Sequence, residues 1–145
     1  MRLWDWVLEA HARPGAGEAC LAIQDDHGQC VTLLLWRAWT VAEGRPVPPA
    51  LLAAAIADAQ AWEGQVTAPI RAARRAMKSL AIVDDAGRVA LRARVQAAEL
   101  DAERLLLEAR TPGAEGARED LAAAWNGTTG VVGALVEALD LNPSP

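Results

Sequence analysis

The residues best suited to chemistry lie in one short stretch that joins two predicted helices. It reads Gln-Asp-Asp-His-Gly-Gln-Cys over residues 24–30, and Cys20 lies seven residues before His27. Thiolates and histidine are good zinc ligands, and a helix would place Cys20 and His27 on one face. The pattern therefore offers Cys20, His27 and Cys30 as a metal site. In the alternative interpretation the two cysteines are small core residues.

The same stretch also offers a corner for a small ligand. His27 titrates near neutral pH and suits proton transfer. Arg37 lies in the apolar helix that follows and must be paired or reach water, with Asp5, Asp25 or Asp26 as obvious partners. This ligand corner consists of Gln24, Asp25, His27 and Arg37. The chain has no nucleophile elbow, phosphate-binding glycine loop or dinucleotide fingerprint, so we expect no catalytic residues and no cofactor.

A second candidate is a stripe of basic side chains on one face of a predicted helix. Its members are Arg71, Arg74, Arg75 and Lys78. The opposite face is apolar and is expected to be buried; it consists of Ile70, Ala73, Met77 and Leu80. Arginine grips phosphate and carboxylate groups well, so the stripe predicts a docking face. The alternative is a solvated face offset by acids of the neighbouring long helix, namely Glu99, Asp101 and Glu103.

The charge distribution supports an anionic partner. The net charge is −5, but residues 71–94 carry seven basic and two acidic side chains, so this window is +5 and the remainder −10. Such a polarised chain can steer an anionic partner to one side. A protein partner or self-association fits best. Nucleic acid is less favoured, because no aromatic residues interleave with the basic ones and the chain is acidic overall.

One apolar helix organises the elements that carry these residues. Residues 31–42 are apolar on nearly every side, as in a helix surrounded by others. The six Trp residues, with no Phe or Tyr, are the expected nodes of the core. The sequence therefore predicts an all-α, single-domain helical bundle of about six to eight helices.

The predicted helices around this centre follow from apolar spacing and end signals. They begin at Leu3, Gly15, Pro49, Thr67, Arg88 and Val131, with a short helix around Leu121 and Trp125. Gly64 is expected to interrupt the fourth helix, and Thr67 to cap the fifth. The helix over 88–110 carries a narrow apolar seam of Leu91, Val95, Ala98, Ala102, Leu105 and Ala109. We divide the chain into a core domain (1–110) and a C-terminal helical extension (111–145).

The chain carries no signal-peptide pattern, and Asp5 and Glu9 interrupt its start. The longest apolar run is too short to span a bilayer and contains Arg37. Two cysteines do not make a disulfide framework. These features predict a soluble cytoplasmic protein without membrane contact.

Four motifs carry a resemblance to a known family. They are Leu3-Trp4-Asp5-Trp6, Pro14-Gly15, Gln24-Asp25-Asp26-His27-Gly28 and Leu33-Leu34-Leu35-Trp36. The stretch Val66–Lys78 adds a Pro-Ile-Arg-x-x-Arg-Arg core. In these residues, spanning Leu3 to Leu80, the chain resembles a family of uncharacterised, mostly proteobacterial, small all-helical proteins. The resemblance implies a cytoplasmic helical domain and supplies no mechanism.

The sequence thus favours a non-catalytic interaction or adaptor protein that docks an anionic partner through its basic stripe. The alternative is a small-ligand or metal-binding protein, which includes an enzyme, with its site around Asp25, His27 and Arg37.

Overall fold

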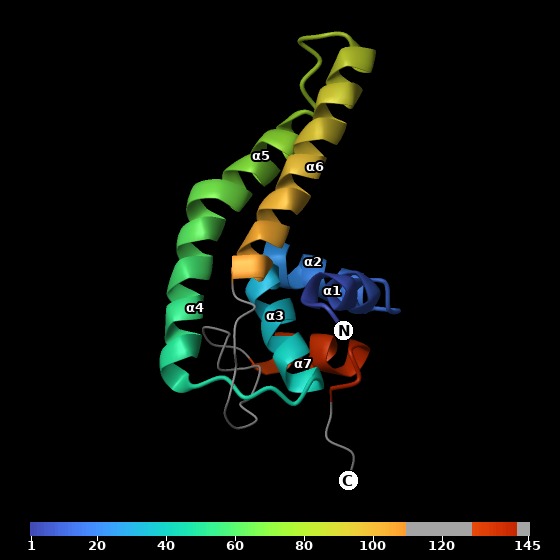
Figure 1. Ribbon diagram of the computed structural model, residues 1–145. Coiled ribbons are helices and arrows are strands. Elements are labelled where there is room, and N and C mark those ends of the chain that lie inside the picture. The colour runs from blue at the N-terminus through green and yellow to red at the C-terminus, as the bar shows by residue number, and fades with distance from the viewer. Residues whose placement is uncertain (110–128, 142–145) are drawn as a thin grey trace.

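The computed structural model describes residues 1–109 and 129–141, and every regular element in this range is a helix (Figure 1). The elements are α1 (Leu3–His11), α2 (Ala16–His27), α3 (Val31–Ala42), α4 (Pro49–Trp62), the π-helical turn η1 (Glu63–Thr67), α5 (Ala68–Ala76), α6 (Asp85–Ala109) and α7 (Thr129–Ala138). The predicted all-α class is confirmed. The predicted break after Thr111 and the short helix around Trp125 lie outside the described residues.

Helix α3 is the centre of the bundle, as its composition predicts. Nine consecutive residues, from Thr32 to Thr40, are buried, and the helix contacts α1, α2, α4 and α6. Of the six Trp, Trp6, Trp36 and Trp39 are buried in the core, while Trp4 and Trp62 pack against it. A helix that is apolar all round can only be stable when other elements surround it.

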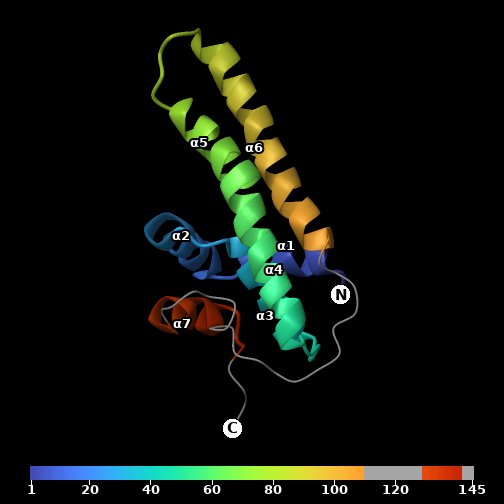
Figure 2. The ribbon, with the colours of Figure 1, turned by 90° about the vertical axis from the view of Figure 1, so that its left-hand side faces the viewer.

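Helices α1, α2 and α7 cover one side of α3. Leu135 and Leu139 of α7 are fully buried, and α7 lies against α2 (Figures 1 and 2). The Arg13 Nη1 group donates a hydrogen bond of 2.7 Å to the Leu139 carbonyl. Helix α2 ends at Gly28, whose left-handed φ of 60° favours glycine. This helix end directs the chain into α3 and so determines the conformation of residues 24–30, which contain the link between the two helices.

Helices α4 and α5 form one continuous rod, which corrects the predicted break at Gly64. The chain passes through the π-helical turn η1, and the Ala68 N–H donates to the Glu63 carbonyl five residues back. Thr67 has helical dihedrals and makes no capping hydrogen bond, so its predicted capping role is wrong. Pro69 explains the turn: it lacks an N–H and its ring crowds the carbonyl four residues back, and a wider turn relieves both problems.

The outer half of this rod pairs with α6 in a helical hairpin that projects from the bundle (Figure 2). Helix α6 begins three residues before the predicted start at Arg88, because Asp84 accepts a hydrogen bond of 2.7 Å from the Gly87 N–H and caps the helix. The Trp62 indole N–H donates to the Ala102 carbonyl at 3.1 Å and ties the base of the hairpin together.

The apolar seam predicted for the long helix is mostly wrong. Leu91 and Leu105 are 49% and 57% exposed. The buried residues of α6 are Glu99, Ala102, Leu106 and Leu107. Only the C-terminal end of α6 reaches the bundle, so apolar residues further out have no core to enter.

Candidate functional site

Arg71 lies at the centre of a buried group of charges between α5 and α6. Its side chain is nearly enclosed, and Nε is 2.9 Å from Glu99 Oε1. Nη1 is 2.5 Å from Glu63 Oε1, and Nη2 is 3.5 Å from Glu103 Oε1. Arg74 Nε binds the second oxygen of Glu99 at 2.5 Å. These five residues, the ion-pair cluster, join α5, α6 and η1.

Carboxylates outnumber guanidinium groups in the ion-pair cluster by three to two. Burial, together with the nearby charges of Glu99 and Glu63, raises the pKa of Glu103 to about 7, although Arg71 acts in the opposite direction. The cluster therefore carries a negative excess whose size depends on pH near neutrality.

A cavity of about 420 Å³ adjoins the ion-pair cluster. The end of α2, the start of α3 and the α4–η1–α5 rod line it. Its polar residues are Gln24, Gln29, Gln60, Glu63 and Arg71, and its apolar residues include Leu33, Ile56 and Ala68. Its size falls in the usual range of small-molecule sites.

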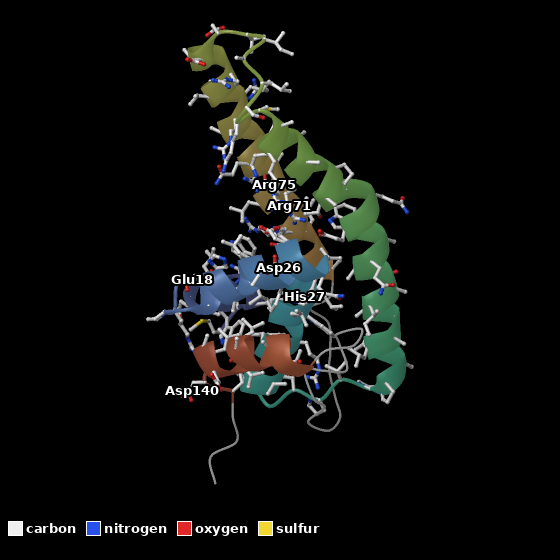
Figure 3. The ribbon with its side chains drawn as sticks, turned by 180° about the vertical axis from the view of Figure 1, so that it is seen from behind. Glu18, Asp26, His27, Arg71, Arg75 and Asp140 are labelled. Atoms are coloured by element: carbon white, nitrogen blue, oxygen red, sulfur yellow. The ribbon has the colours of Figure 1, made fainter. Side chains whose placement is uncertain are left out.

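An ion pair spans from α2 to the hairpin beside this cavity. Arg75 Nη2 is 2.5 Å from Asp25 Oδ1, and Figure 3 shows Arg71 and Arg75 on the hairpin above Asp26 and His27. The hydrogen bond from Arg75 lowers the pKa of Asp25. Both side chains of the pair are exposed, so it stabilises the protein by less than about 1 kcal/mol.

Residues 2–109 match a protein family described as "Protein of unknown function (DUF2390)". The chain belongs to this family. The match confirms the resemblance and extends past Leu80 through the whole of α6, so the hairpin is part of the family domain. The search of curated proteins and the search of solved structures each found no match. Within the described residues, no helix is both long and apolar enough to cross a membrane.

This DUF2390 chain turns the first two residues of its basic stripe, Arg71 and Arg74, inward, which corrects the sequence-based face assignment of α5. Arg71 is buried and Arg74 half-buried, while Ala73 and Leu80, expected inside, are exposed. Arg75 is paired with Asp25, so Lys78 alone of the four is both exposed and without an ion pair among the described residues. Of the acids named in the alternative interpretation, Glu99 and Glu103 do pair with this helix, although at buried residues and not on a solvated face. No sequence pattern pointed to Glu63, which the π-helical turn brings to Arg71.

The predicted ligand corner does not assemble as one site. Gln24, Asp25 and His27 share the end of α2, with Asp25 and His27 exposed. Arg37 is instead fully buried inside α3, where its Nη1 donates to Thr40 Oγ1 at 2.8 Å. Because α3 is enclosed on all sides, its arginine cannot reach the exposed corner. Gln24 alone of the four lines the cavity.

The alternative metal site of Cys20, His27 and Cys30 does not assemble in the described part of the structure. Cys20 and Cys30 are free, buried thiols, whereas His27 is exposed at the end of α2. Burial raises the pKa of each thiol to about 11, which opposes the thiolate form that a metal requires. Within residues 1–109 and 129–141, no three His, Cys, Asp or Glu side chains lie close enough together to hold a metal ion.

The end of the hairpin is a surface that the sequence reasoning missed. We define the hairpin end as residues 78–94. The described residues include ten exposed large apolar side chains, and half of them lie here: Leu80, Ile82, Val83, Val89 and Leu91. The sequence feature that could have revealed this surface is the adjacent pair Ile82 and Val83. These two apolar residues directly precede the turn and belong to no amphipathic helix face. Clustered exposed apolar residues are typical of interaction sites.

Proposed function

We propose that the protein is a docking protein that binds an acidic, amphipathic segment of a partner protein with its hairpin end. The observation that carries the proposal is the exposure of Ile82 (82%), Val83 (60%) and Val89 (64%) at the point of the molecule furthest from the core (Figure 2). Burying this much apolar surface against a partner is favourable by about 25 cal/mol per Å².

The charges of the hairpin end argue for an acidic partner. Its two acids are already engaged, because Asp85 pairs with Arg88 and Asp84 accepts the Gly87 N–H. Lys78, Arg92 and Arg94 form no ion pair within the described residues. The surface therefore offers unneutralised cations beside apolar side chains, which suits an acidic amphipathic segment.

The shape and composition favour a protein over a nucleic acid. The hairpin end contains no aromatic residue, and stacking on aromatic side chains is the usual means of binding unpaired bases. The proposal assigns the protein to the cytoplasm, since Cys20 and Cys30 are free and reduced thiols persist there. Docking is a non-catalytic role, so it requires no activated nucleophile or cofactor.

A photo-crosslinking residue introduced at Ile82, in the full chain inside its own host cells, tests the proposal. We expect one discrete protein adduct, whose cross-linked peptide is acidic and amphipathic. The triple variant Lys78→Glu, Arg92→Glu, Arg94→Glu should abolish the adduct, because like charges then face the partner. Thermal unfolding of the variant should remain close to that of the parent, since these cations make no ion pairs to lose.

The matched control is the same crosslinker at Leu21, which is 56% exposed on α2. It should yield no corresponding adduct. An adduct that persists in the triple variant, a lipid or nucleic acid adduct, or a second copy of this chain at Ile82 would each contradict the proposal.

A further inference from the structure

The cavity beside the ion-pair cluster is not used by the proposed docking function. Residues from the end of α2 and from the η1 turn line it, and no residue of the hairpin end does. Its lining combines apolar side chains, among them Leu33 and Ile56, with polar ones, among them Glu63. Such a combination is typical of pockets that hold an apolar body and orient one polar group.

The charged groups at and next to the cavity include more carboxylates than guanidinium groups. Glu63 and Arg71 line it, Glu99 and Glu103 contact Arg71, and Arg74 contacts Glu99, so three carboxylates and two guanidinium groups meet here. The negative excess grows as Glu103 loses its proton, at a pKa of about 7. The buried Cys30 thiol also lines the cavity. Burial is the main cause of its raised pKa, and the negative charges of Glu63 and Glu103 raise this pKa further. Arg71 is held by three carboxylates, which leaves it poorly placed to bind an anion.

Two glutamine side chains of the lining also offer hydrogen-bond acceptors. Gln24 and Gln29 direct their amide N–H groups to the Asp25 carboxylate and the His27 carbonyl, at 3.3 Å and 3.4 Å. Their amide oxygens are therefore left to accept from a ligand. The C-terminal end of α2 also lies here, and a helix C-terminus favours a positive charge.

From this combination we infer that the cavity binds a small organic ammonium ion carried on an apolar body. The ammonium group donates to Glu63 and to the amide oxygens of Gln24 and Gln29, and the apolar body packs on Leu33 and Ile56. An ammonium has three donors and no acceptor, which matches a wall rich in acceptors. A carboxylate or phosphate would instead face the negative excess.

Gly64 provides a way to close the cavity without damaging the fold. It lines the cavity and is helical, and a Cβ built on it meets no atom within 4 Å. The variant Gly64→Leu therefore adds a side chain in open space at the ligand position. Because leucine favours helix over glycine, the melting temperature of this variant should stay equal or rise. The control is Gly133→Leu in α7, where a Cβ also meets nothing within 4 Å.

Titration calorimetry of the full chain with hexylamine, hexanol and hexanoate tests the inference, because the three probes share an apolar body and differ in charge. Hexylamine should bind about tenfold or more tighter than hexanol, as expected for one extra ion pair near a protein surface, and hexanoate should bind weakest. Gly64→Leu should abolish hexylamine binding, and Gly133→Leu should retain it. Glu63→Gln should remove most of the preference for hexylamine over hexanol.

Three results would overturn the inference. One is no binding of hexylamine, and another is hexanol or hexanoate binding as tightly as the amine. The third is unchanged hexylamine binding by Gly64→Leu, because the amine would then occupy another part of the surface. None of these results bears on docking at the hairpin end, which involves different residues.

Discussion

Helix α3 buries nine consecutive residues, from Thr32 to Thr40, whereas α5 buries Arg71 and leaves Ala73 and Ala76 exposed. Both helices pack against α6. They meet different parts of it: α3 contacts the end that enters the core with Leu106 and Leu107, and α5 contacts the part that carries Glu99. The side chain that a helix buries therefore depends on what its neighbour presents.

The two regions are held by different forces. In the bundle, apolar side chains leave water, and this contribution grows with the area buried. In the hairpin, ion pairs must first repay the cost of removing charges from water, so their net contribution is smaller. Apolar residues of the hairpin end thus remain exposed although the helices around them are well formed. The hairpin depends on charges for its pairing and leaves its apolar residues available to a partner.

The largest expected effect is in the bundle. Trp36→Ala removes a side chain that is 2% exposed and leaves a cavity in the most enclosed helix. The free energy of unfolding should fall by about 3–5 kcal/mol. Urea denaturation measures it, with Leu21→Ala on the surface of α2 as a control expected to change stability by less than about 0.5 kcal/mol. A loss at Trp36 as small as that of the control would remove the distinction between α3 and the surface helices.

The next effect is in the hairpin. Arg71→Met keeps most of the side-chain volume but leaves Glu63 and Glu103 without their partner, and Glu99 with Arg74 alone. Stability should fall by about 2–3 kcal/mol at neutral pH, as when one partner of a partly buried ion pair is removed. The loss should shrink as pH falls below about 7, because Glu103, whose pKa is raised to about 7, then binds a proton and loses its charge.

Arg104→Met is the matched control for this measurement. Arg104 pairs with Glu108 on α6, and both side chains are nearly half exposed. Such a solvent-screened surface pair is expected to contribute little to stability. Equal losses for Arg71→Met and Arg104→Met would show that the ion-pair cluster behaves as an ordinary surface network.

The smallest effect is a pH dependence caused by Glu103. Its pKa is raised from 4.5 to about 7 in the folded protein, so between these values the folded state binds the proton that the unfolded state has lost. Stability therefore falls as pH rises from about 5 to 7 and levels off above. The contribution is about 1–2 kcal/mol, discounted because the side chain is 29% exposed.

Glu103→Gln isolates this contribution from the rest of the titration. The variant should lack the decrease between pH 5 and 7 and should be more stable than the parent above pH 7. Denaturation at four pH values from 5 to 8 measures the difference, in which other titrating groups cancel. Parallel pH profiles for parent and variant would mean that Glu103 titrates at its ordinary pKa.

Local signals were sufficient for several parts of the structure. The central helix begins and ends at Val31 and Ala42 as its composition predicted. Gly28 ends α2, Pro49 begins α4 and Asp84 begins α6, each for a local reason of backbone conformation or hydrogen bonding. The candidate site was predicted less well. The sequence analysis treated the ligand corner and the basic stripe as two unrelated candidates, whereas Asp25 of the first forms an ion pair with Arg75 of the second.

The helical class and the buried centre at α3 follow from the amino-acid sequence alone, since composition and apolar spacing fix them, and the family follows from the sequence match over residues 2–109. Which face of α5 is buried depends on the packing of distant parts of the chain. The spacing of Arg71 and Arg74 opposite Ile70 and Met77 defines two faces and does not say which one meets α6. That choice depends on Glu63, brought close by the π-helical turn, and on Glu99 and Glu103, which lie about thirty residues away in sequence.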